Sequence, residues 1–440
     1  MKKIVIFILC FSFIIPFFSP PENPVFIDGV TIHGYDVSGL TKDQAREKLS
    51  PYLKEILKQE IILTAPENKQ IWITTYQDMG IKLNLEEAID EGLVIGNKGF
   101  IFKRWWEIIK VRKEKYNIPL KIKIEDEIAI KEIEKLTTSL VKKPKDAKLV
   151  ITPDNKVTIR PDISGVGIDI NRMINNLKQN IKLQGPISIK VLTREVKAKT
   201  TAQSLKELKI EFLLGQFTTW YNPRKKNRAE NIRKAAQALD NFMLPPQKEF
   251  SFNAIVGPRT KEAGYNEAPI ILNNRFTQGL GGGVCQVSST LYNVLLRGNI
   301  TVTERHPHSL PVHYVPKGMD AAVVYGFKDL KFINNTKGYI LIKTYVGQGS
   351  LTIKLFGPKK DDNEVELLSI VEKTILPKTI VKSRPDLLTG QVIVKQHGEE
   401  GYIVRVERII RDKNKNVLVH ELLTRDYYPP VDKVIFTSSN

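Results

Sequence analysis

The chain has 440 residues, 42% of them hydrophobic, with 27 Gly and 24 Pro. This composition excludes a collagen, a coiled coil and wholesale disorder, and at about 150 residues per domain the length predicts roughly three domains. Lys and Arg number 67 against 48 Asp and Glu, giving a formal net charge of +19. Such an excess favours polyanionic surroundings, which leaves nucleic acid, an anionic membrane and an anionic cell wall to be distinguished.

The first residues have the pattern of an export segment. Lys2 and Lys3 precede an apolar run from Ile4 to Phe18, which is typical of a secretory signal or an N-terminal anchor. The run ends without a small-x-small cleavage site, so both a secreted and a membrane-anchored form stay open for residues 1–24. We therefore predict an extracytoplasmic protein of the cell envelope. Nucleic acid is not expected as a partner, because the chain has no basic-aromatic module of the usual kinds.

A repeat in the first half predicts two related α+β modules. Two short motifs recur 87 positions later in the chain: Pro66–Lys69 as Pro153–Lys156, and Gly80–Asn84 as Gly167–Asn171. In each copy a helical segment comes first, at 42–58 and 126–140, and alternating apolar residues, a Gly turn and a second helix follow. We expect the modules at 29–115 and 116–198. A scaffold or binding role is favoured, since neither copy contains a catalytic constellation.

The second half is predicted to contain one mixed and one all-β domain. Residues 227–241 show helical spacing, and the Gly- and Pro-rich stretch 250–283 is predicted to be rich in loops. From Thr301 onward the pattern is that of strands, in the segments VTERH, PVHYV, AAVVYGF, YILIKTYV and SLTIKLFG. The tail contains a predicted hairpin with its turn at Asp412–Asn416. These patterns predict a mixed α/β domain at 205–360 and an all-β domain at 365–440.

One cysteine stands out because the predicted exported part of the chain has no other. The chain has two Cys, and Cys10 belongs to the N-terminal apolar run, so Cys285 is a lone thiol. It follows Gly281–Gly283, and the apolar spacing after it predicts a helix that packs on an antiparallel sheet. In the first turn of a helix the free N–H groups and the helix dipole lower the pKa of a thiol. Gln286 and the main chain near Gly283 are candidates for holding an oxyanion.

A base and an orienting acid follow Cys285 in the sequence. His306, His308 and His313 lie on a predicted strand, and Asp320 opens the next one. Cysteine on a helix, histidine on a strand and aspartate on the next strand is the order of transglutaminase-like and papain-like acyl-transfer enzymes. We prefer His308 as the base, because Pro307 and the strand alternation leave one histidine facing Cys285. Asp320 would orient its imidazole.

Three other readings of Cys285 stay open. In the first, Cys285 is a structural residue packed in the core. In the second it binds a metal together with His306 and His308, although no spacing matches a standard zinc site. In the third the glycines cradle a phosphate, although the segment lacks the lysine of a phosphate loop. We expect no cofactor and no metal.

Many motifs in the right order make the stretch from Leu205 to Gly357 resemble the VanW domain, which is named from vancomycin-resistance gene clusters. The matching motifs are Asn231–Ile232, FSFN at 250–253, GPRT at 257–260, Gly264–Tyr265, GGGVCQVSSTLYN at 281–293, ERHPHS at 304–309, YVPKGMDAAV at 314–323 and DLKFINNT at 329–336. The family pattern includes Cys285, Gln286, Arg305, His308 and Asp320, and with it Arg305 and His306 become further binding candidates.

The flanking regions resemble two other envelope modules. Gly29 to Leu192 resembles the peptidoglycan-binding-like domain that commonly precedes VanW domains. Leu368 to Asn440 resembles the G-five domain, a β-rich module, with Gly390, Gly398 and Gly401 present but the glycine expected in the closing segment missing. Together these resemblances imply an α+β multidomain protein that binds peptidoglycan or an anionic wall polymer. A family name taken from a resistance cluster is not evidence of resistance.

Two hypotheses of different classes follow. In the first, the protein is a wall enzyme in which Cys285 attacks a peptide amide, with His308 as general base and acid and Asp320 as the orienting group. In the second, it is a non-catalytic wall-binding or assembly protein with a structural cysteine.

Overall fold

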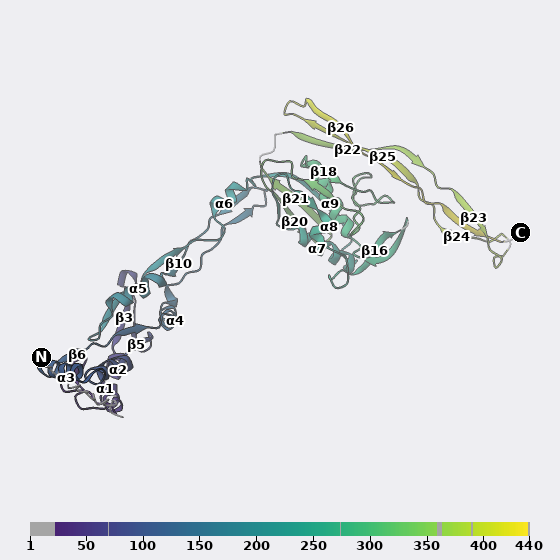
Figure 1. Cartoon of the computed structure of the whole chain (residues 1–440). Coiled ribbons are helices and arrows are strands. Elements are labelled where there is room, and N and C mark those ends of the chain that lie inside the picture. The colour runs from purple at the N-terminus through teal and green to yellow at the C-terminus, as the bar shows by residue number, and fades with distance from the viewer. Residues whose placement is uncertain (1–22, 69, 273, 359–362, 389, 439–440) are drawn as a thin grey trace, which may run out of the picture. The chain divides into compact units, whose positions relative to one another are not determined.

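The computed structural model describes residues 23–68, 70–272, 274–358, 363–388 and 390–438 (Figure 1). The predicted export signal or anchor lies outside these residues except for its last two positions. Within the described part of the chain, no helix has both the length and the apolar character needed to cross a bilayer. The protein is a multidomain α+β chain, and its contacts group into two units, Met1–Lys145 with Ile163–Ala198, and Asp146–Asp162 with Lys199–Asn440.

The first unit alternates short strands and helices. In chain order its elements are β1 (Val30–Ile32), β2 (Tyr35–Asp36), α1 (Lys42–Leu57), β3 (Glu60–Thr64), β4 (Ile71–Thr75), β5 (Ile81–Leu83), α2 (Leu85–Val94), α3 (Ile101–Glu114), β6 (Tyr116–Ile118), β7 (Ile122–Ile124), α4 (Asp126–Leu136), β10 (Gly165–Ile168), α5 (Ile170–Asn180), β11 (Ile187–Lys190) and β12 (Thr193–Val196). The helices predicted at 42–58 and 126–140 are confirmed as α1 and α4, although α4 ends earlier and a 3-10 turn follows it, and the second helix predicted in each copy is confirmed as α2 and α5.

Two cores stabilise this unit, and the second contains residues from both copies of the repeat. Phe26, Ile32, Leu49 and Ile89 belong to the first core, which α1, α2 and α3 surround. In the second, β11 pairs in parallel with β3, which is followed by the antiparallel β4, so Ile187 of the second copy lies beside Ile61 of the first. The sheet β11-β3-β4 therefore joins strands of the two copies.

The second unit begins with a hairpin and continues through a mixed domain into long strands. Its elements are β8 (Lys148–Ile151), β9 (Val157–Arg160), α6 (Ala202–Glu207), β13 (Phe212–Trp220), α7 (Lys226–Leu239), β14 (Phe242–Leu244), β15 (Glu249–Ser251), α8 (Phe252–Val256), β16 (Glu267–Leu272), β17 (Arg275–Leu280), α9 (Val284–Arg297), β18 (Thr301–Glu304), β19 (Lys331–Ile333), β20 (Ile340–Val346), β21 (Ser350–Gly357), β22 (Glu364–Ile375), β23 (Thr379–Ser383), β24 (Val392–Gln396), β25 (Gly401–Arg411), β26 (Val417–Tyr428) and β27 (Lys433–Thr437).

The largest core of the unit lies between helices α7 and α9 and an antiparallel sheet. The sheet has the strand order β13-β21-β20-β14, and α9 contacts β13 and β21 while α7 contacts β20 and α9 (Figure 1). Helix α9 is buried over nearly its whole length because Val287, Leu291, Val294 and Leu295 all pack into the core. Burying these apolar side chains is the main driving force that holds α9 in place.

Two of the predicted strands are wrong. Residues 311–315 and 321–327 form irregular segments, in which a single bridge joins Val324 to Lys328, and β18 ends at Glu304 before the three histidines. His306, His308 and Asp320 therefore lie on loops and not on strands. The stretch 250–283, predicted to be rich in loops, contains α8 and the hairpin of β16 and β17.

Side chains of α9 explain why 319–321 needs no sheet partner. Ser288 Oγ donates to the carbonyl of Ala321 at 2.6 Å, and Ser289 Oγ accepts from the N–H of Ala321 at 2.9 Å. The amide of Asn293 donates to the carbonyl of Met319 at 2.7 Å. The buried backbone of 319–321 thus has its hydrogen bonds satisfied by polar side chains of α9. The segment can therefore pack on the core without pairing with another strand.

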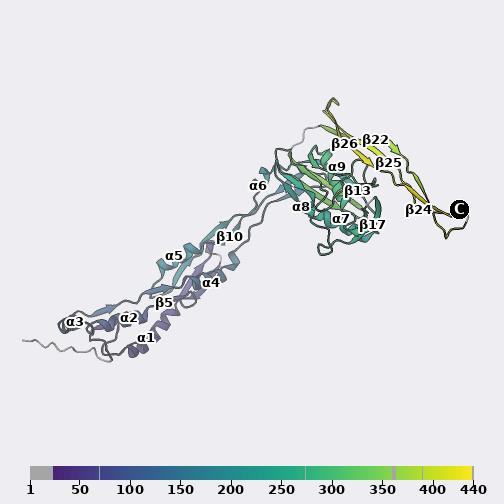
Figure 2. The ribbon, with the colours of Figure 1, turned by 45° about the vertical axis from the view of Figure 1, so that its right-hand side comes forward.

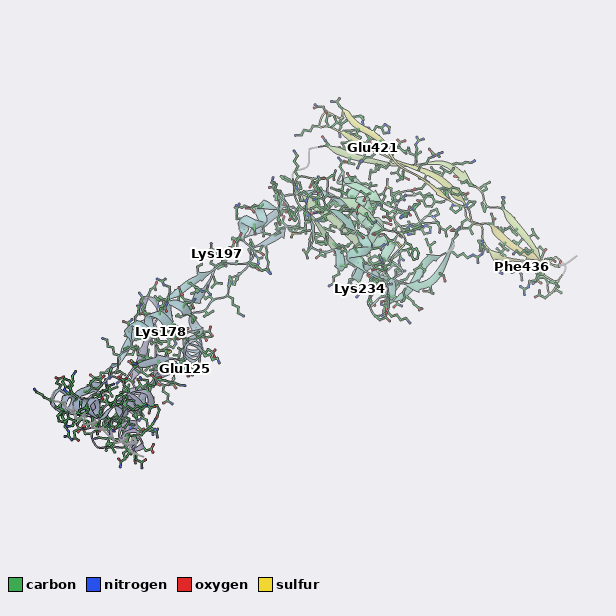
Figure 3. All side chains as sticks on the ribbon, in the orientation of Figure 1. Glu125, Lys178, Lys197, Lys234, Glu421 and Phe436 are labelled. Carbon is green, nitrogen blue, oxygen red and sulfur yellow. The ribbon has the colours of Figure 1, made fainter. Side chains whose placement is uncertain are left out.

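The C-terminal region is rich in strands. β22, β25 and β26 form one antiparallel sheet, in which the predicted turn at Asp412–Asn416 is confirmed between β25 and β26 (Figure 2). β23, β27 and β24 form a second sheet, in which most side chains of β23 and β24 are exposed. Phe436, labelled in Figure 3, lies on β27.

Candidate functional site

Three glycines shape the turn that leads into α9. Gly281 and Gly283 have φ of +78° and +111°, a backbone conformation that side chains with a Cβ rarely adopt. A Cβ on Gly282 would lie 2.6 Å from the carbonyl oxygen of Ala268. The turn therefore needs glycine for two separate reasons, and it places Cys285 in the first turn of the helix.

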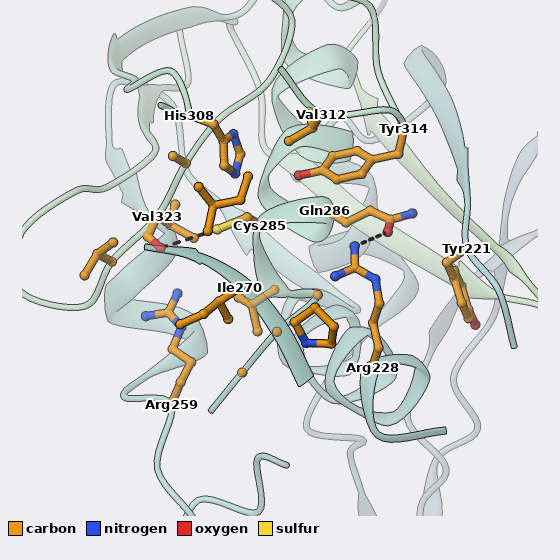
Figure 4. A pocket seen from close by; sticks show the side chains of 18 of the residues that line it. Tyr221, Arg228, Arg259, Ile270, Cys285, Gln286, His308, Val312, Tyr314 and Val323 are labelled. Carbon is orange, nitrogen blue, oxygen red and sulfur yellow. Dashed lines mark hydrogen bonds between the residues drawn. The ribbon is translucent and has the colours of Figure 1, made fainter. Parts of the chain in front are cut away.

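Cys285 opens onto a cavity. Its side chain is partly buried, and its Sγ lies 3.5 Å from the carbonyl oxygen of Val323 (Figure 4). The cavity, about 920 Å³ in volume, is also lined by His308 and Tyr314. Among the described residues, the N–H groups of Val284 and Gln286 donate to carbonyls of the turn, whereas the N–H of Cys285 has no protein acceptor. That free donor is one of the unpaired groups at a helix start.

His308 and Asp320 form a tight buried pair. His308 Nδ1 lies 2.5 Å from Asp320 Oδ2, and the backbone N–H of His308 donates to the same oxygen at 2.7 Å. These two contacts orient the imidazole, which lines the same cavity as Cys285. Both Asp320 and His308 are almost fully buried, with exposed fractions of 1% and 7%.

The other oxygen of Asp320 is held by residues far along the chain. Tyr428 at the end of β26 donates to Asp320 Oδ1 at 2.5 Å, and Arg305 approaches the same oxygen at 3.2 Å. Arg305 also donates twice to the carboxylate of Asp426, at 2.6 and 2.7 Å. Asp320 is therefore fully hydrogen-bonded, as a buried carboxylate must be to stay ionised.

The electrostatics favour an ion pair between thiol and imidazole. Burial alone raises the pKa of Cys285, but the nearby imidazole of His308 outweighs it and brings that pKa below its ordinary value. Burial lowers the pKa of His308, yet its bonds to Asp320 and Cys285 raise it to about 9. The pKa of Asp320 would rise on burial, but His308 and Arg305 lower it to about 2. Asp320 thus stays negative and stabilises an imidazolium beside the thiolate.

Comparisons with known proteins assign this region to a family. Residues 227–356 match the family described as VanW like protein. The chain carries a VanW-like domain. Residues 72–188 match the family described as putative peptidoglycan binding domain, so the first unit contains most of that match.

Two curated relatives match part of this chain. The uncharacterized protein YoaR of Bacillus subtilis (strain 168) is 40% identical over 173 residues, which cover 39% of this chain and 57% of that protein. The vancomycin B-type resistance protein VanW of Enterococcus faecalis (strain ATCC 700802 / V583) is 32% identical over 117 residues, 26% of this chain and 42% of that protein. The matches thus span about half the length of these relatives.

Solved G5 domains show a weaker likeness. The G5 domain of the IgA1 protease matches 19% of this chain and 95% of its own length, with 24% identity and a TM-score of 0.16. The G5 domain of HP0197 matches 18% of this chain and all of its own length, with 14% identity and a TM-score of 0.13.

The structure brings three of the predicted site residues together. His308 is hydrogen-bonded to Asp320, and His308 and Cys285 line the same cavity within the VanW-like domain. Of the binding candidates, Gly283 is the residue before α9, and Arg305 contacts Asp320 and not the cavity. His306 is paired at 3.1 Å with Glu304, away from the cavity lining.

Gln286 has a structural set of partners. Its amide nitrogen donates to Thr219 Oγ1 at 3.1 Å and to the carbonyl of Trp220 at 3.0 Å, and its oxygen accepts from Arg228 at 3.0 Å. Figure 4 shows the bond between Arg228 and Gln286 along the cavity wall. The side chain of Gln286 therefore fixes α9 to β13 and positions Arg228.

Several residues of the site escaped the sequence analysis. The cavity is lined by the Lys and Arg side chains Lys225, Arg228, Arg259 and Lys328. Its described lining includes no Asp or Glu. One guanidinium nitrogen of Arg259 donates to Asn253 at 2.7 Å, while the other is buried without a partner in the described structure. Burial lowers the pKa of Arg259, which the nearby Cys285 opposes. Arg259 belongs to the GPRT motif, which contributed to the resemblance to the VanW domain but did not indicate a role for this arginine.

The described residues contain no group of three or more His, Cys, Asp and Glu arranged to hold a metal ion. Near Cys285, the imidazole of His308 is instead hydrogen-bonded to the carboxylate of Asp320.

Proposed function

We propose that this is an envelope-associated protein that binds peptidoglycan or an anionic wall polymer and uses Cys285 for acyl transfer or amide hydrolysis on wall peptides. The observation that carries the proposal is that Cys285 lines an open cavity together with His308, whose imidazole is held by the buried Asp320. A buried ion pair with no reactive role would not need to open onto solvent space.

The chemistry follows from the geometry of the three groups. The Cys285 thiolate attacks the carbonyl carbon of an amide, and the oxyanion that forms is stabilised by the free N–H of Cys285 at the start of α9. The His308 imidazolium gives its proton to the leaving amine, which departs and leaves a thioester on Cys285. Water then releases the acid, or a second amine takes the acyl group, with His308 accepting the proton of the attacking group.

The charge of the cavity indicates the substrate class. Lys225, Arg228, Arg259 and Lys328 line the same cavity as the thiol, and the described lining has no acidic side chain to oppose them. Guanidinium groups bind carboxylates through paired hydrogen bonds. We therefore propose a substrate peptide with a carboxylate near the scissile amide, as wall stem peptides have.

The remainder of the chain supports attachment to the wall. Residues 72–188 match a putative peptidoglycan binding domain, and the net charge of +19 favours anionic polymers. The relative from Enterococcus faecalis is named a resistance protein, and we propose for this chain the envelope location alone. The N-terminal apolar run would export or tether it.

A non-catalytic wall-binding protein is the second candidate. The contact of Cys285 Sγ with the carbonyl of Val323 favours it, because a thiol that bridges a helix and a loop also has a packing role. In this case the cavity binds its ligand without reacting.

One experiment separates the two candidates. The full chain is incubated with purified wall fragments, and the mass of intact protein and of released fragments is measured by mass spectrometry. The proposal predicts a thioester adduct on Cys285 that hydroxylamine removes, and no adduct in Cys285→Ser. His306→Gln is the matched control, because this histidine lies outside the cavity and its change should leave the adduct intact. Tight wall binding with no adduct and no altered fragment would support the second candidate.

A further inference from the structure

Helix α3 of the first unit presents a large apolar face to solvent. Phe102, Trp105 and Trp106 have exposed fractions of 83%, 63% and 68%, and Ile101 and Ile109 are also exposed. Soluble proteins rarely expose so many large apolar side chains in one patch unless the patch binds something. We call the residues Ile101, Phe102, Trp105, Trp106 and Ile109 the α3 outer face.

The spacing shows that these residues share one side of the helix. Ile101, Trp105 and Ile109 follow one another at intervals of four, and Phe102 and Trp106 form the adjacent row. The opposite side is the one that packs on the unit, where Val111 is buried. The α3 outer face is therefore not needed to hold the helix in place.

The inner side carries the contacts that fix α3. Glu107 accepts a hydrogen bond from the N–H of Gly96 at 2.9 Å, and Arg104 donates to the carbonyl of the same residue at 3.0 Å. Both side chains are partly buried, so the loop before α3 and the helix form one unit. Substitutions on the outer face should leave these contacts unchanged.

Basic residues border the outer face. Lys103, Lys110, Arg112 and Lys113 lie on α3, and Lys98 and Lys115 lie just before and after it. A helix with tryptophan and phenylalanine on one face and Lys and Arg beside it is typical of helices that lie in the interface of an anionic bilayer. Tryptophan in particular favours the boundary between headgroups and acyl chains.

The start of the described chain runs beside α3. Arg112 on α3 donates to Asp28 at 2.8 Å, and Asn97 donates to the carbonyl of Val25 at 2.8 Å. The apolar run from Ile4 to Phe18 is therefore joined by only a few residues to the part of the chain that contacts α3. A chain that enters the bilayer through that run would leave it close to this helix.

From these observations we propose that the α3 outer face lies in the interface of an anionic lipid bilayer and holds the first unit against the membrane surface. The proposal is independent of the chemistry at Cys285. The α3 outer face would be a second membrane contact besides the N-terminal apolar run. Two membrane contacts together give stable attachment where one alone is weak.

The test uses the fluorescence of the chain's own tryptophans. The chain has four Trp, at 72, 105, 106 and 220. The full chain with Trp72→Phe and Trp220→Phe retains the pair on α3, and the full chain with Trp105→Phe and Trp106→Phe retains the other two. Trp220 is a matched control, because its exposed fraction of 70% resembles that of Trp106. Each protein is mixed with phosphatidylglycerol vesicles whose acyl chains carry bromine.

Bromine quenches only those tryptophans that reach the acyl chains. We expect the emission of the first variant to fall by about half or more and that of the second to change little, since α3 alone has the interfacial pattern. Equal quenching of the two variants, or none in either, would overturn the proposal. So would sedimentation showing that the chain pairs through α3 without lipid and that Trp105→Ser with Trp106→Ser makes it monomeric.

Discussion

The phenol of Tyr428 donates a hydrogen bond of 2.5 Å to Oδ1 of Asp320, whose other oxygen holds the imidazole of His308. Tyr428 ends strand β26 of the C-terminal sheet, so that sheet takes part in positioning the carboxylate beside Cys285. Within the second unit, the strand-rich region and the VanW-like domain therefore share one buried polar network.

Replacing Tyr428 by Phe should destabilise the second unit by about 1.5–3 kcal/mol, the usual value of a hydrogen bond to a charged group. The change also leaves the N–H of Gly318 unpaired, because it donates to the same phenol at 2.8 Å. Urea unfolding followed by far-ultraviolet circular dichroism measures the loss. The control is Tyr427→Phe, whose side chain is 56% exposed and should change stability by less than about 0.5 kcal/mol. Equal effects of the two changes would contradict the network.

Removing Arg305 should cost about 3–5 kcal/mol, because its loss leaves Asp320 and Asp426 buried without their counter-charge. The side chain of Arg305 is 5% exposed, and it bonds both carboxylates. Arg384→Ala breaks an exposed pair with Asp386 and should cost less than about 1 kcal/mol. Thermal unfolding of both variants tests the difference, and a mild effect of Arg305→Ala would show that the pair is not essential to the fold.

The sequence predicted part of this site correctly. The glycine run and the apolar spacing after it predicted that Cys285 starts a helix, and the structure confirms this with α9. His308 and Asp320 were chosen from their order in the chain, and they do lie together, although their chemical role stays a prediction. The strands expected to carry them were wrong: β18 ends at Glu304 before His308, and next to Asp320 the backbone of Met319 and Ala321 bonds to Ser288, Ser289 and Asn293 of the helix.

Other parts of the site left no local trace in the sequence. Tyr428 and Asp426 lie more than a hundred residues beyond Asp320, and only the pairing of β25 with β26 brings them to it. Arg259 likewise reaches the cavity through the fold between α8 and β16. Contacts between residues so distant in the chain depend on tertiary packing, which the spacing of residues along one segment does not encode.

Substituting Gly282 by Ala should displace the turn before Cys285, because the new methyl would lie 2.6 Å from the carbonyl oxygen of Ala268. We expect a loss of about 1–3 kcal/mol in stability and slower reaction of the thiol. Gly347→Ala is the control, since its methyl would meet the movable hydroxyl of Ser350. Thermal unfolding and thiol titration measure the two effects. A Gly282→Ala protein that matches the unsubstituted chain in both would contradict the packing of this turn.

Asp320→Asn should move the alkaline limit of any Cys285-dependent activity to lower pH. Asp320 and Cys285 together raise the pKa of His308 to about 9, so the imidazolium is retained up to about that pH in the native protein. Without the carboxylate, the pKa of His308 falls, because burial is then opposed by Cys285 alone. The falling limb of the pH–rate profile should therefore lie near 9 in the native chain and at lower pH in the variant. If the falling limb of the pH–rate profile stays at the same pH in Asp320→Asn, a group other than His308 determines the alkaline limit.

The most direct test of the account is the rate at which iodoacetamide alkylates Cys285 as a function of pH. The full chain carries Cys10→Ser so that Cys285 is its one thiol, and His308→Gln and the control His306→Gln are measured beside it. We predict that alkylation follows a pKa below the ordinary thiol value of about 8.5 and that His306→Gln leaves it unchanged. His308→Gln should slow the reaction at neutral pH by about tenfold or more, since burial then raises the pKa of the thiol. A thiol that does not react in the folded chain, or reacts equally with and without His308, would contradict the account.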